Sequence, residues 1–282
     1  MSAESHPHPH LTRARAWLRW LRALFQRPND DPRKTLAVAL VLCLVCSVVV
    51  SATAVGLRPL QERNAARALK SEVIKVAGLE TTGMSLDQAF DQIEQRLVEL
   101  ETGEFVDDAD PLTYSYRDAA KNPAASRALA EAGRAGIQRR PDRMPVYLVR
   151  ENGQLQTIIL PVYGAGLWST LHGLLALAPD GRTAKALTFY EQRETAGLGS
   201  EVAGERWLSE WPGKVLIDER GEPVIEVVKG RVDADAPHAE HRVDGLSGAT
   251  LTSNGVTNLM RFWLGEQGYG PFLARLSDEN CG

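Results

Sequence analysis

The chain has 282 residues, of which 44% are hydrophobic and 24% are charged. This composition is that of an ordinary folded protein of one or two domains, and it excludes wholesale disorder. The formal net charge is −4, but residues 1–34 hold seven Lys or Arg against three Asp or Glu. The larger remainder is therefore acidic and has no general affinity for nucleic acid.

The basic arm of residues 1–34 is expected to have two parts. His6, His8 and His10 alternate with prolines, a pattern that favours a disordered terminus over a fixed metal site. From Leu11 to Phe25, tryptophan and leucine interleave with arginine, which predicts a short helix at an anionic membrane surface. A helix that docks on a neighbouring protein of the same complex is the alternative.

Residues 35–57 form a run of 23 residues without a charge. At about 1.5 Å rise per residue, a helix of this length reaches about 34 Å and crosses a membrane. A cleaved signal peptide is the competing interpretation, but its apolar core is usually shorter. The flanking basic residues give a modest preference for a cytoplasmic N-terminus. Cys43 and Cys46 lie inside the run, where cysteine acts mostly as a small hydrophobe.

Beyond the span, helical and extended segments alternate. Residues 61–79 are predicted to continue the helix of the span. Ser85 and Gln88 form a capping box, and apolar spacing predicts an amphipathic helix from Leu86 to about Glu101. Residues 107–143 are expected to mix short strands with loops.

Three hairpins are then predicted from extended runs that flank glycine-bearing turns. The runs are 146–149 with 155–162, 171–177 with 184–190, and 215–217 with 224–228. The expected fold class is α+β: one N-terminal transmembrane helix, followed by a domain at residues 58–282 of antiparallel β-sheet with packed helices.

A candidate anion site lies in residues 244–256. The small residues Ser247, Gly248 and Ala249 allow close approach to the backbone, and Thr250 follows where an apolar helical pattern begins. A helix start offers unpaired N–H groups and a favourable dipole to a phosphate. The alternative is that these hydroxyls only cap the helix.

Two glycine-bearing turns add further candidate ligand contacts. Residues 163–169 expose the large aromatic side chain of Trp168, and residues 194–199 begin with Glu194 and Thr195 and contain Leu198. Thr195 and backbone amides could hydrogen-bond the polar edge of a planar ligand, while Leu198 or Trp168 covers its apolar face. Each turn taken singly is equally compatible with a plain hairpin loop.

The three motifs together resemble those of a flavoprotein family. The Ser-Gly-Ala-Thr string resembles a flavinylation motif, and the two turns resemble the Gly-Leu-Trp and Glu-Thr-Pro-Gly-Leu-Gly signatures of the FMN-binding domain in two groups of respiratory proteins. These are the NqrC proteins of the Na+-translocating NADH:quinone reductase and the RnfG proteins of the Rnf complex. Ala196 stands where the family usually has proline. The string of residues 244–256, followed by residues 262–265 and 270–272, favours the reductase group.

The resemblance implies one FMN attached covalently through a phosphodiester at Thr250. The cofactor-binding residues implied or suggested beside it are Ser247, Gly248, Ala249, Leu251, Asp244, Glu194, Thr195, Leu198 and Trp168. It also implies a flavin transferase that uses FAD during maturation. No catalytic residue and no metal site are expected on this chain, because His172, His238 and His241 are scattered in the sequence.

The implied function is that of a one-electron carrier in a membrane complex of about six subunits. The chain would relay electrons from NADH toward ubiquinone, while partner subunits pump Na+. It would sit in the bacterial inner membrane with a cytoplasmic N-terminus and a periplasmic FMN domain. The alternatives are an RnfG-type flavoprotein and a non-redox, membrane-tethered binding or assembly module.

Overall fold

The computed structural model describes residues 28, 31–79, 82–129, 133 and 135–281. The predictions for His6, His8, His10 and the helix from Leu11 to Phe25 lie outside these residues. The chain divides into two compact units, residues 1–65 and 66–282, and each is described by itself.

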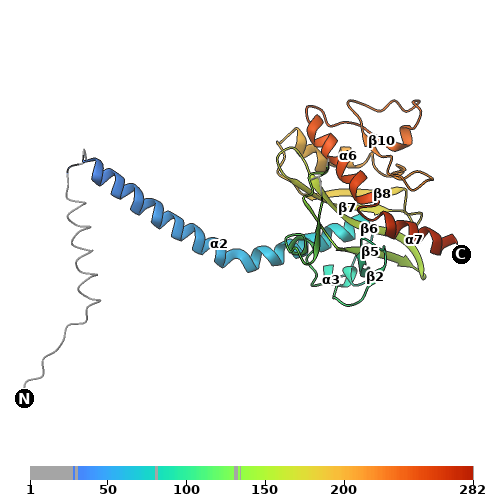
Figure 1. Ribbon diagram of the computed structural model, residues 1–282, viewed down its shortest axis with the longest axis horizontal. Coiled ribbons are helices and arrows are strands. Elements are labelled where there is room, and N and C mark those ends of the chain that lie inside the picture. Colours follow the sequence, from blue (N-terminus) through green and yellow to red (C-terminus); the bar gives the residue numbers. More distant parts are fainter. Residues whose placement is uncertain (1–27, 29–30, 80–81, 130–132, 134, 282) are drawn as a thin grey trace, which may run out of the picture. The chain divides into compact units, whose positions relative to one another are not determined.

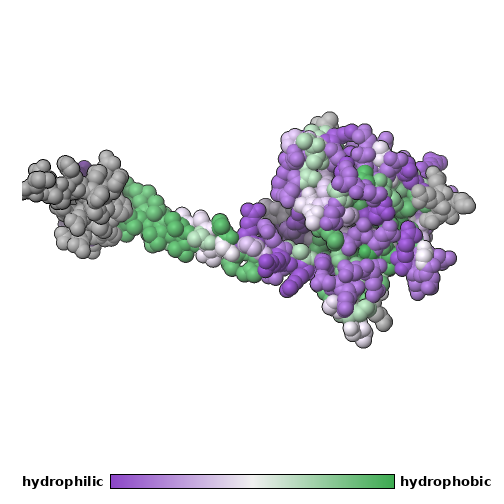
Figure 2. All heavy atoms as spheres, turned by 90° about the horizontal axis from the view of Figure 1, so that it is seen from below, coloured by the Kyte–Doolittle hydropathy of each residue, from purple (hydrophilic) through white to green (hydrophobic). Residues whose placement is uncertain are grey.

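Helix α2, Pro32–Ala77, makes up most of the described part of the first unit, and its residues 66–77 belong to the second unit. Its most apolar stretch of 18 residues has a mean hydropathy of 2.7, and none of it is buried against other parts of the protein. Figure 2 shows this apolar surface along the helix. Within the described residues it is the one helix long and apolar enough to cross a membrane. The prediction that residues 61–79 continue the helix of the span is confirmed, as far as Ala77.

The second unit is built on a six-stranded sheet in which every neighbouring pair is antiparallel. Its strand order is β2 (Phe105–Val106), β1 (Glu94–Glu99), β5 (Arg143–Glu151), β6 (Gln154–Ala165), β7 (Thr170–Leu177) and β8 (Ala184–Glu191). The two predicted hairpins β5–β6 and β7–β8 are confirmed. Asn152 has a φ of 51° and Gly153 a φ of 82°, the left-handed pair that a tight turn favours.

Alternate residues of the central strands enter two different cores, because side chains of a strand point to opposite faces. Val146 and Leu148 pack in the larger core, whereas Tyr147 and Val149 pack in the smaller one. Helices α6 (Thr250–Leu264) and α7 (Gly270–Cys281) contribute to the larger core. The end of α2 and helix α3 (Leu86–Phe90) contribute to the smaller core. Figure 1 shows these elements against the sheet.

The predicted helix from Leu86 to Glu101 is wrong beyond its first turn. The capping box of Ser85 and Gln88 is present, but the helix ends at Phe90. Residues 94–99 instead form β1, which pairs with β5 on one side and β2 on the other. Leu97 and Val98, neighbours in sequence, are both fully buried. Strand pairing between distant segments therefore overrides the local helical spacing.

The third predicted hairpin is also wrong as a strand pair. The turn exists, since Gly221 N donates to Asp218 O, but across it the two segments form only one isolated antiparallel bridge, between Ile217 and Pro223. Strand β9 (Glu226–Val227) pairs in parallel with β10 (Arg242–Val243) instead. The remaining short elements are α4 (Tyr116–Ala119), β3 (Ser126–Ala128), β4 (Arg139–Pro141), η1 (Gly199–Ala203), α5 (Glu205–Leu208) and η2 (Ala239–His241).

Candidate functional site

Helix α6 begins at Thr250 as the apolar pattern predicted, and its first turn has no side-chain cap. Ala249 is the N-cap residue, no side chain accepts a hydrogen bond there, and the first turn contains no acidic residue. The interpretation of Ser247 and Thr250 as simple helix caps is therefore not supported. The side chain of Thr250 is exposed, so its hydroxyl is accessible beside a helix start that attracts anions.

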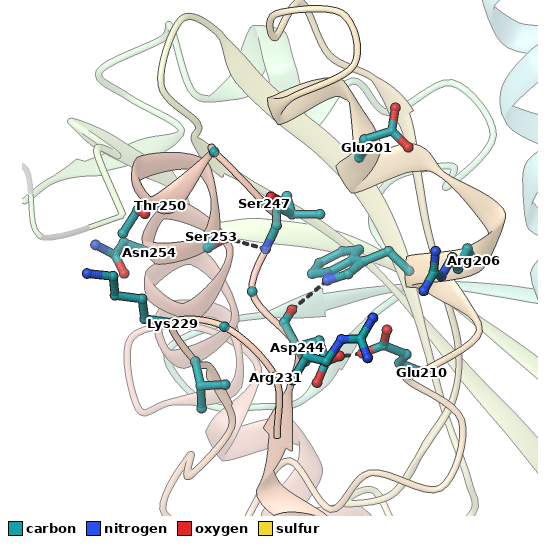
Figure 3. A pocket seen from close by; sticks show the side chains of 16 residues that line it. Glu201, Arg206, Glu210, Lys229, Arg231, Asp244, Ser247, Thr250, Ser253 and Asn254 are labelled. Atoms are coloured by element: carbon teal, nitrogen blue, oxygen red, sulfur yellow. Dashed lines mark hydrogen bonds between the residues drawn. The ribbon is translucent and has the colours of Figure 1, made fainter. Parts of the chain in front are cut away.

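A cavity of about 620 Å³ opens beside this helix start. Thr250, Ser247, Gly248 and Asp244 line it (Figure 3). Its walls also carry three basic residues, Arg206, Lys229 and Arg231, and two further acidic residues, Glu201 and Glu210. In Figure 3, Lys229, Asn254 and Thr250 are seen on one side of the cavity, and Arg206, Arg231 and Glu210 on the other. The cavity thus offers cations near an accessible hydroxyl.

Asp244 ties the cavity wall together. Its carboxylate accepts a hydrogen bond of 2.7 Å from Val232 N, and its backbone carbonyl accepts one of 2.7 Å from Trp207 Nε1. Its backbone N–H donates to Glu210 Oε2 at 3.1 Å. Burial raises the pKa of the Glu210 carboxyl above its usual value, and the nearby Asp244 charge adds to this, although the hydrogen bond from Asp244 N opposes it. The acidic residue that precedes the turn is therefore part of the scaffold of the cavity.

Glu194 is buried and joins three segments of the chain. Its Oε1 accepts hydrogen bonds from Trp168 N, Ser169 N and Ser169 Oγ, at 3.0, 3.1 and 3.2 Å. Its Oε2 accepts from Leu167 N at 3.1 Å and from Thr252 Oγ1 at 2.8 Å. Burial alone would raise the pKa of this carboxyl, but these donors outweigh it and hold the pKa below its usual value. The carboxylate fixes both glycine-bearing turns against α6.

Glycines allow these segments to approach closely. A Cβ at Gly199 would lie 2.8 Å from Thr252 Oγ1, and one at Gly255 would overlap the backbone oxygen of Ala165. Both approaches are too close for a side chain. The two glycines therefore let the loop of residues 194–199 and strand β6 pack directly on α6.

Apolar side chains remain exposed around the start of α6. Trp168 is 72% exposed, Leu251 is 59% exposed, and Leu167 and Leu198 are each 43% exposed. Leu198 also touches the Ser247–Ala249 turn, since a Cβ at Gly248 would lie 2.9 Å from Leu198 Cδ2. Such a group of large exposed apolar side chains is typical of a binding surface.

The residues predicted from the sequence occupy three kinds of position. Thr250, Ser247, Gly248 and Asp244 line the cavity. Trp168, Leu198 and Leu251 are exposed, as is Thr195. Glu194 and Ala249 are buried, so the carboxylate of Glu194 supports the turns from behind.

Several polar residues of the site could not be predicted from the sequence. Arg206, Glu210, Lys229 and Arg231 come from segments that carry no motif, and only the fold brings them to the cavity. Thr252 could have been suspected from the sequence, because it follows Thr250 by two residues on the same helix. Its structural role is the hydrogen bond to Glu194, which is 58 residues away in the sequence.

Comparison with known proteins gives the class of the domain first. The family model of the FMN-binding domain matches residues 166–265, a stretch that contains both glycine-bearing turns from Gly166 onward and the first turn of α6. The domain is therefore an FMN-binding domain.

Similar proteins then define the family. The chain is 49% identical over 252 residues to the NqrC protein of the Na(+)-translocating NADH-quinone reductase of Vibrio vulnificus, covering 89% of this chain and 97% of that protein. It is 48% identical over 253 residues to the protein of the same name from Pseudomonas aeruginosa, covering 88% and 97%. The crystal structure of Shewanella oneidensis NqrC superposes with a TM-score of 0.69 at 35% identity, covering 74% of this chain and 96% of that one.

The chain belongs to the NqrC family, one of the subunits of the Na+-translocating NADH-quinone reductase. This result selects one of the two flavoprotein groups that the motifs suggested. It also leaves the non-redox binding or assembly module without support.

Proposed function

We propose that Thr250 Oγ carries FMN through a phosphodiester bond and that this chain serves as the covalent-flavin electron carrier of its reductase. The observation that supports the attachment residue most directly is the position of Thr250. Its accessible side chain opens onto a 620 Å³ cavity at a helix start without a side-chain cap. A flavin transferase would attach FMN from FAD to this hydroxyl, with the threonine proton lost and AMP released.

The residues of this chain fit both ends of FMN. At the phosphate end, the first N–H groups of α6 favour an anion, and Lys229 among the cavity residues adds a positive charge. At the ring end, the exposed side chains of Trp168, Leu198 and Leu251 offer apolar contact to a flat aromatic ring. Ser247, in the turn before α6, and Thr195, in the turn of residues 194–199, are also exposed, and their hydroxyls are available to hydrogen-bond the cofactor.

The remaining residues hold these contacts in place. Glu194 fixes the turn of Trp168 through three backbone N–H groups and fixes α6 through Thr252. Bound FMN would supply one-electron chemistry, which a relay between neighbouring cofactors requires. Covalent attachment suits this role, because the cofactor cannot be lost by dissociation.

The proposed arrangement in the cell follows the chain. Helix α2 anchors the protein in the inner membrane as a single span, with the N-terminus in the cytoplasm and residues 58–282 in the periplasm. The proposed partners are the other membrane subunits of a complex of about six, and these carry out Na+ transport. A reporter enzyme that is active only in the periplasm, fused after Gly282, is expected to be active. If this fusion were inactive, and a second fusion with a reporter that works only in the cytoplasm were active at the same position, the proposed orientation would be wrong.

The attachment site is tested by the intact mass of the denatured full chain, expressed with an active flavin transferase, and by peptide mapping. We expect one added FMN on Thr250. The variant Thr250→Val is expected to have the unmodified mass. Because Thr250 is exposed and caps nothing, the substitution should change the free energy of unfolding by no more than about 0.5 kcal/mol.

Ser247→Ala is the matched control, since Ser247 is also exposed and also lines the cavity. This variant should keep its covalent flavin. If Thr250→Val retained FMN while Ser247→Ala lost it, the attachment residue would be Ser247 and the proposal for Thr250 would fail.

A further inference from the structure

Outside the flavin site, the structure brings together three side chains that could bind a metal ion. His238, Glu240 and His241 each offer one ligand atom, and these atoms lie within 4.8 Å of one another. Glu240 Oε1 is 3.8 Å from His238 Nδ1 and 3.4 Å from His241 Nε2. Ligands about 2.0–2.2 Å from a tetrahedral zinc ion lie roughly 3.3–3.6 Å apart. The side chains therefore need only small movements to share one ion.

The tautomer of His241 is already set for metal binding. Its Nδ1 lies 2.7 Å from the backbone carbonyl of Val215. A carbonyl can only accept a hydrogen bond, so Nδ1 carries the proton and the Nε2 of a neutral ring offers its lone pair. That lone pair belongs to the atom that faces Glu240. A ligating histidine usually donates its other N–H in this way, which orients the ring.

The turn that carries the three residues is held in place from a separate segment. Val215 N donates to Glu240 O at 3.0 Å, and Lys214 Nζ donates to Ala239 O at 3.0 Å. His238 has a left-handed backbone with a φ of 64°, a conformation that is uncommon for residues other than glycine. This bend lets the rings of His238 and His241 stack, with centroids 5.8 Å apart and an interplanar angle of 21°. The two imidazoles are therefore gathered on one side of the turn.

We infer that His238, Glu240 and His241 form a binding site for a divalent transition-metal ion of the zinc class. Two imidazoles and a carboxylate are a ligand set that suits zinc. Three protein ligands leave a fourth position for water. This site is separate from Thr250. It replaces the expectation from the sequence that the histidines are too scattered to form a metal site.

The expected effect of the metal is to hold the segment that leads to the flavin cavity. Strand β10 follows the turn directly, and Val243 O accepts a hydrogen bond from Val228 N at 2.9 Å. The next residue, Asp244, lines the cavity. Bound metal should therefore slow amide hydrogen exchange in residues 238–244.

The test uses Zn2+ as the probe and the full chain in detergent, with thiols kept reduced. Binding is measured by competition with a chromophoric chelator. The first variant is His238→Asn, because asparagine tolerates the left-handed backbone and leaves the His241–Val215 bond intact. The second is Glu240→Gln, which keeps both imidazoles. We expect each change to weaken one Zn2+ site at least 10-fold, and His238→Asn with His241→Gln to weaken it at least 100-fold.

The matched control is the chain with His6, His8 and His10 changed to alanine, since these histidines are a second possible source of Zn2+ binding. The three cysteines are the same in every variant. Wild-type Zn2+ affinity in this control, together with the expected weakening in the His238 and Glu240 variants, supports the proposal. Wild-type affinity in the double variant, or an equally weakened affinity in the control, overturns it. Circular dichroism of each variant verifies that the fold is unchanged.

Discussion

Thr252 Oγ1 donates a hydrogen bond of 2.8 Å to Glu194 Oε2, and both residues are buried. The same carboxylate accepts hydrogen bonds from the turn that carries Trp168. One residue thus links helix α6, two residues after the proposed attachment point, to the two turns that resemble flavin-binding signatures. Glu194 therefore positions the two turns relative to α6.

Thr252→Val should loosen this link without changing the shape of the side chain. The change removes one hydrogen bond to a charged acceptor, and we expect it to lower the free energy of unfolding by about 1.5–3 kcal/mol. Urea unfolding of the full chain in detergent measures this cost. Thr250→Val is the control on the same helix turn and should cost no more than about 0.5 kcal/mol. Equal costs at the two positions would contradict the assigned role of Thr252.

Glu194 should make stability depend on pH in the acid range. Its pKa in the folded protein is held below the ordinary value of 4.5, so the folded state favours the ionised form. Its contribution is therefore present above the unfolded pKa and is lost as pH falls through the folded pKa. We expect the difference in unfolding free energy between wild type and Glu194→Gln to be largest near pH 7 and to shrink toward pH 3. A difference that is constant over this range would show that the carboxylate charge does not stabilise the fold.

His172 should add a second pH dependence, at higher pH. Burial, together with the charge of Arg117 and opposed by Glu191, lowers the pKa of this imidazole from 6.5 to about 4. The unfolded state then binds more protons between these values, so stability should fall as pH drops from 6.5 to about 4. His172→Asn should flatten this part of the profile, measured as the urea midpoint at each pH. An unchanged slope would assign the dependence to other groups.

Local patterns in the sequence predicted the elements that are held by local interactions. Residues 250–264 carry apolar side chains at helical spacing, and the Asn152-Gly153 turn sets its hairpin directly. The helix predicted for residues 94–99 was wrong, because pairing with β5 and β2 makes this segment a strand. A pairing between distant segments leaves little trace in a window of a few residues.

The site shows the same division. The motif pointed to Thr250, but Arg206, Lys229 and Arg231 reach the cavity only through folding. The histidine cluster could not be predicted from the sequence either. His238 and His241 are three residues apart, and their rings lie on the same side because His238 has a left-handed backbone conformation. Backbone conformation at a single non-glycine position could not be predicted from residue type.

Gly255→Ala tests how closely α6 packs on β6. Within a helix, alanine is favoured over glycine by about 1 kcal/mol. Here, however, the new Cβ would overlap the backbone oxygen of Ala165, and forced overpacking typically costs about 1–3 kcal/mol, which outweighs that gain over most of this range. We expect net destabilisation in urea unfolding. Asn254→Ala, at the exposed neighbouring position, should instead be neutral or stabilising by about 0.5 kcal/mol. Stabilisation by both changes would mean that the helix can move away from the strand.

Ala196→Pro tests whether the departure from the family signature matters for the second turn. Leu198 N donates to Thr195 O at 3.1 Å, and Gly197 has a φ of 73°, which together indicate a type II turn with Ala196 at its second position. Proline is favoured there because its fixed φ matches the turn. We expect the substitution to stabilise the full chain by about 0.4–1 kcal/mol in urea unfolding, since it restricts the unfolded chain. Ala184→Pro is the contrasting control, because Ala184 N donates to Lys214 O and that bond would be lost. If Ala196→Pro were as destabilising as the control, the turn would have a different conformation, and proline in the related signatures would have to act in another way.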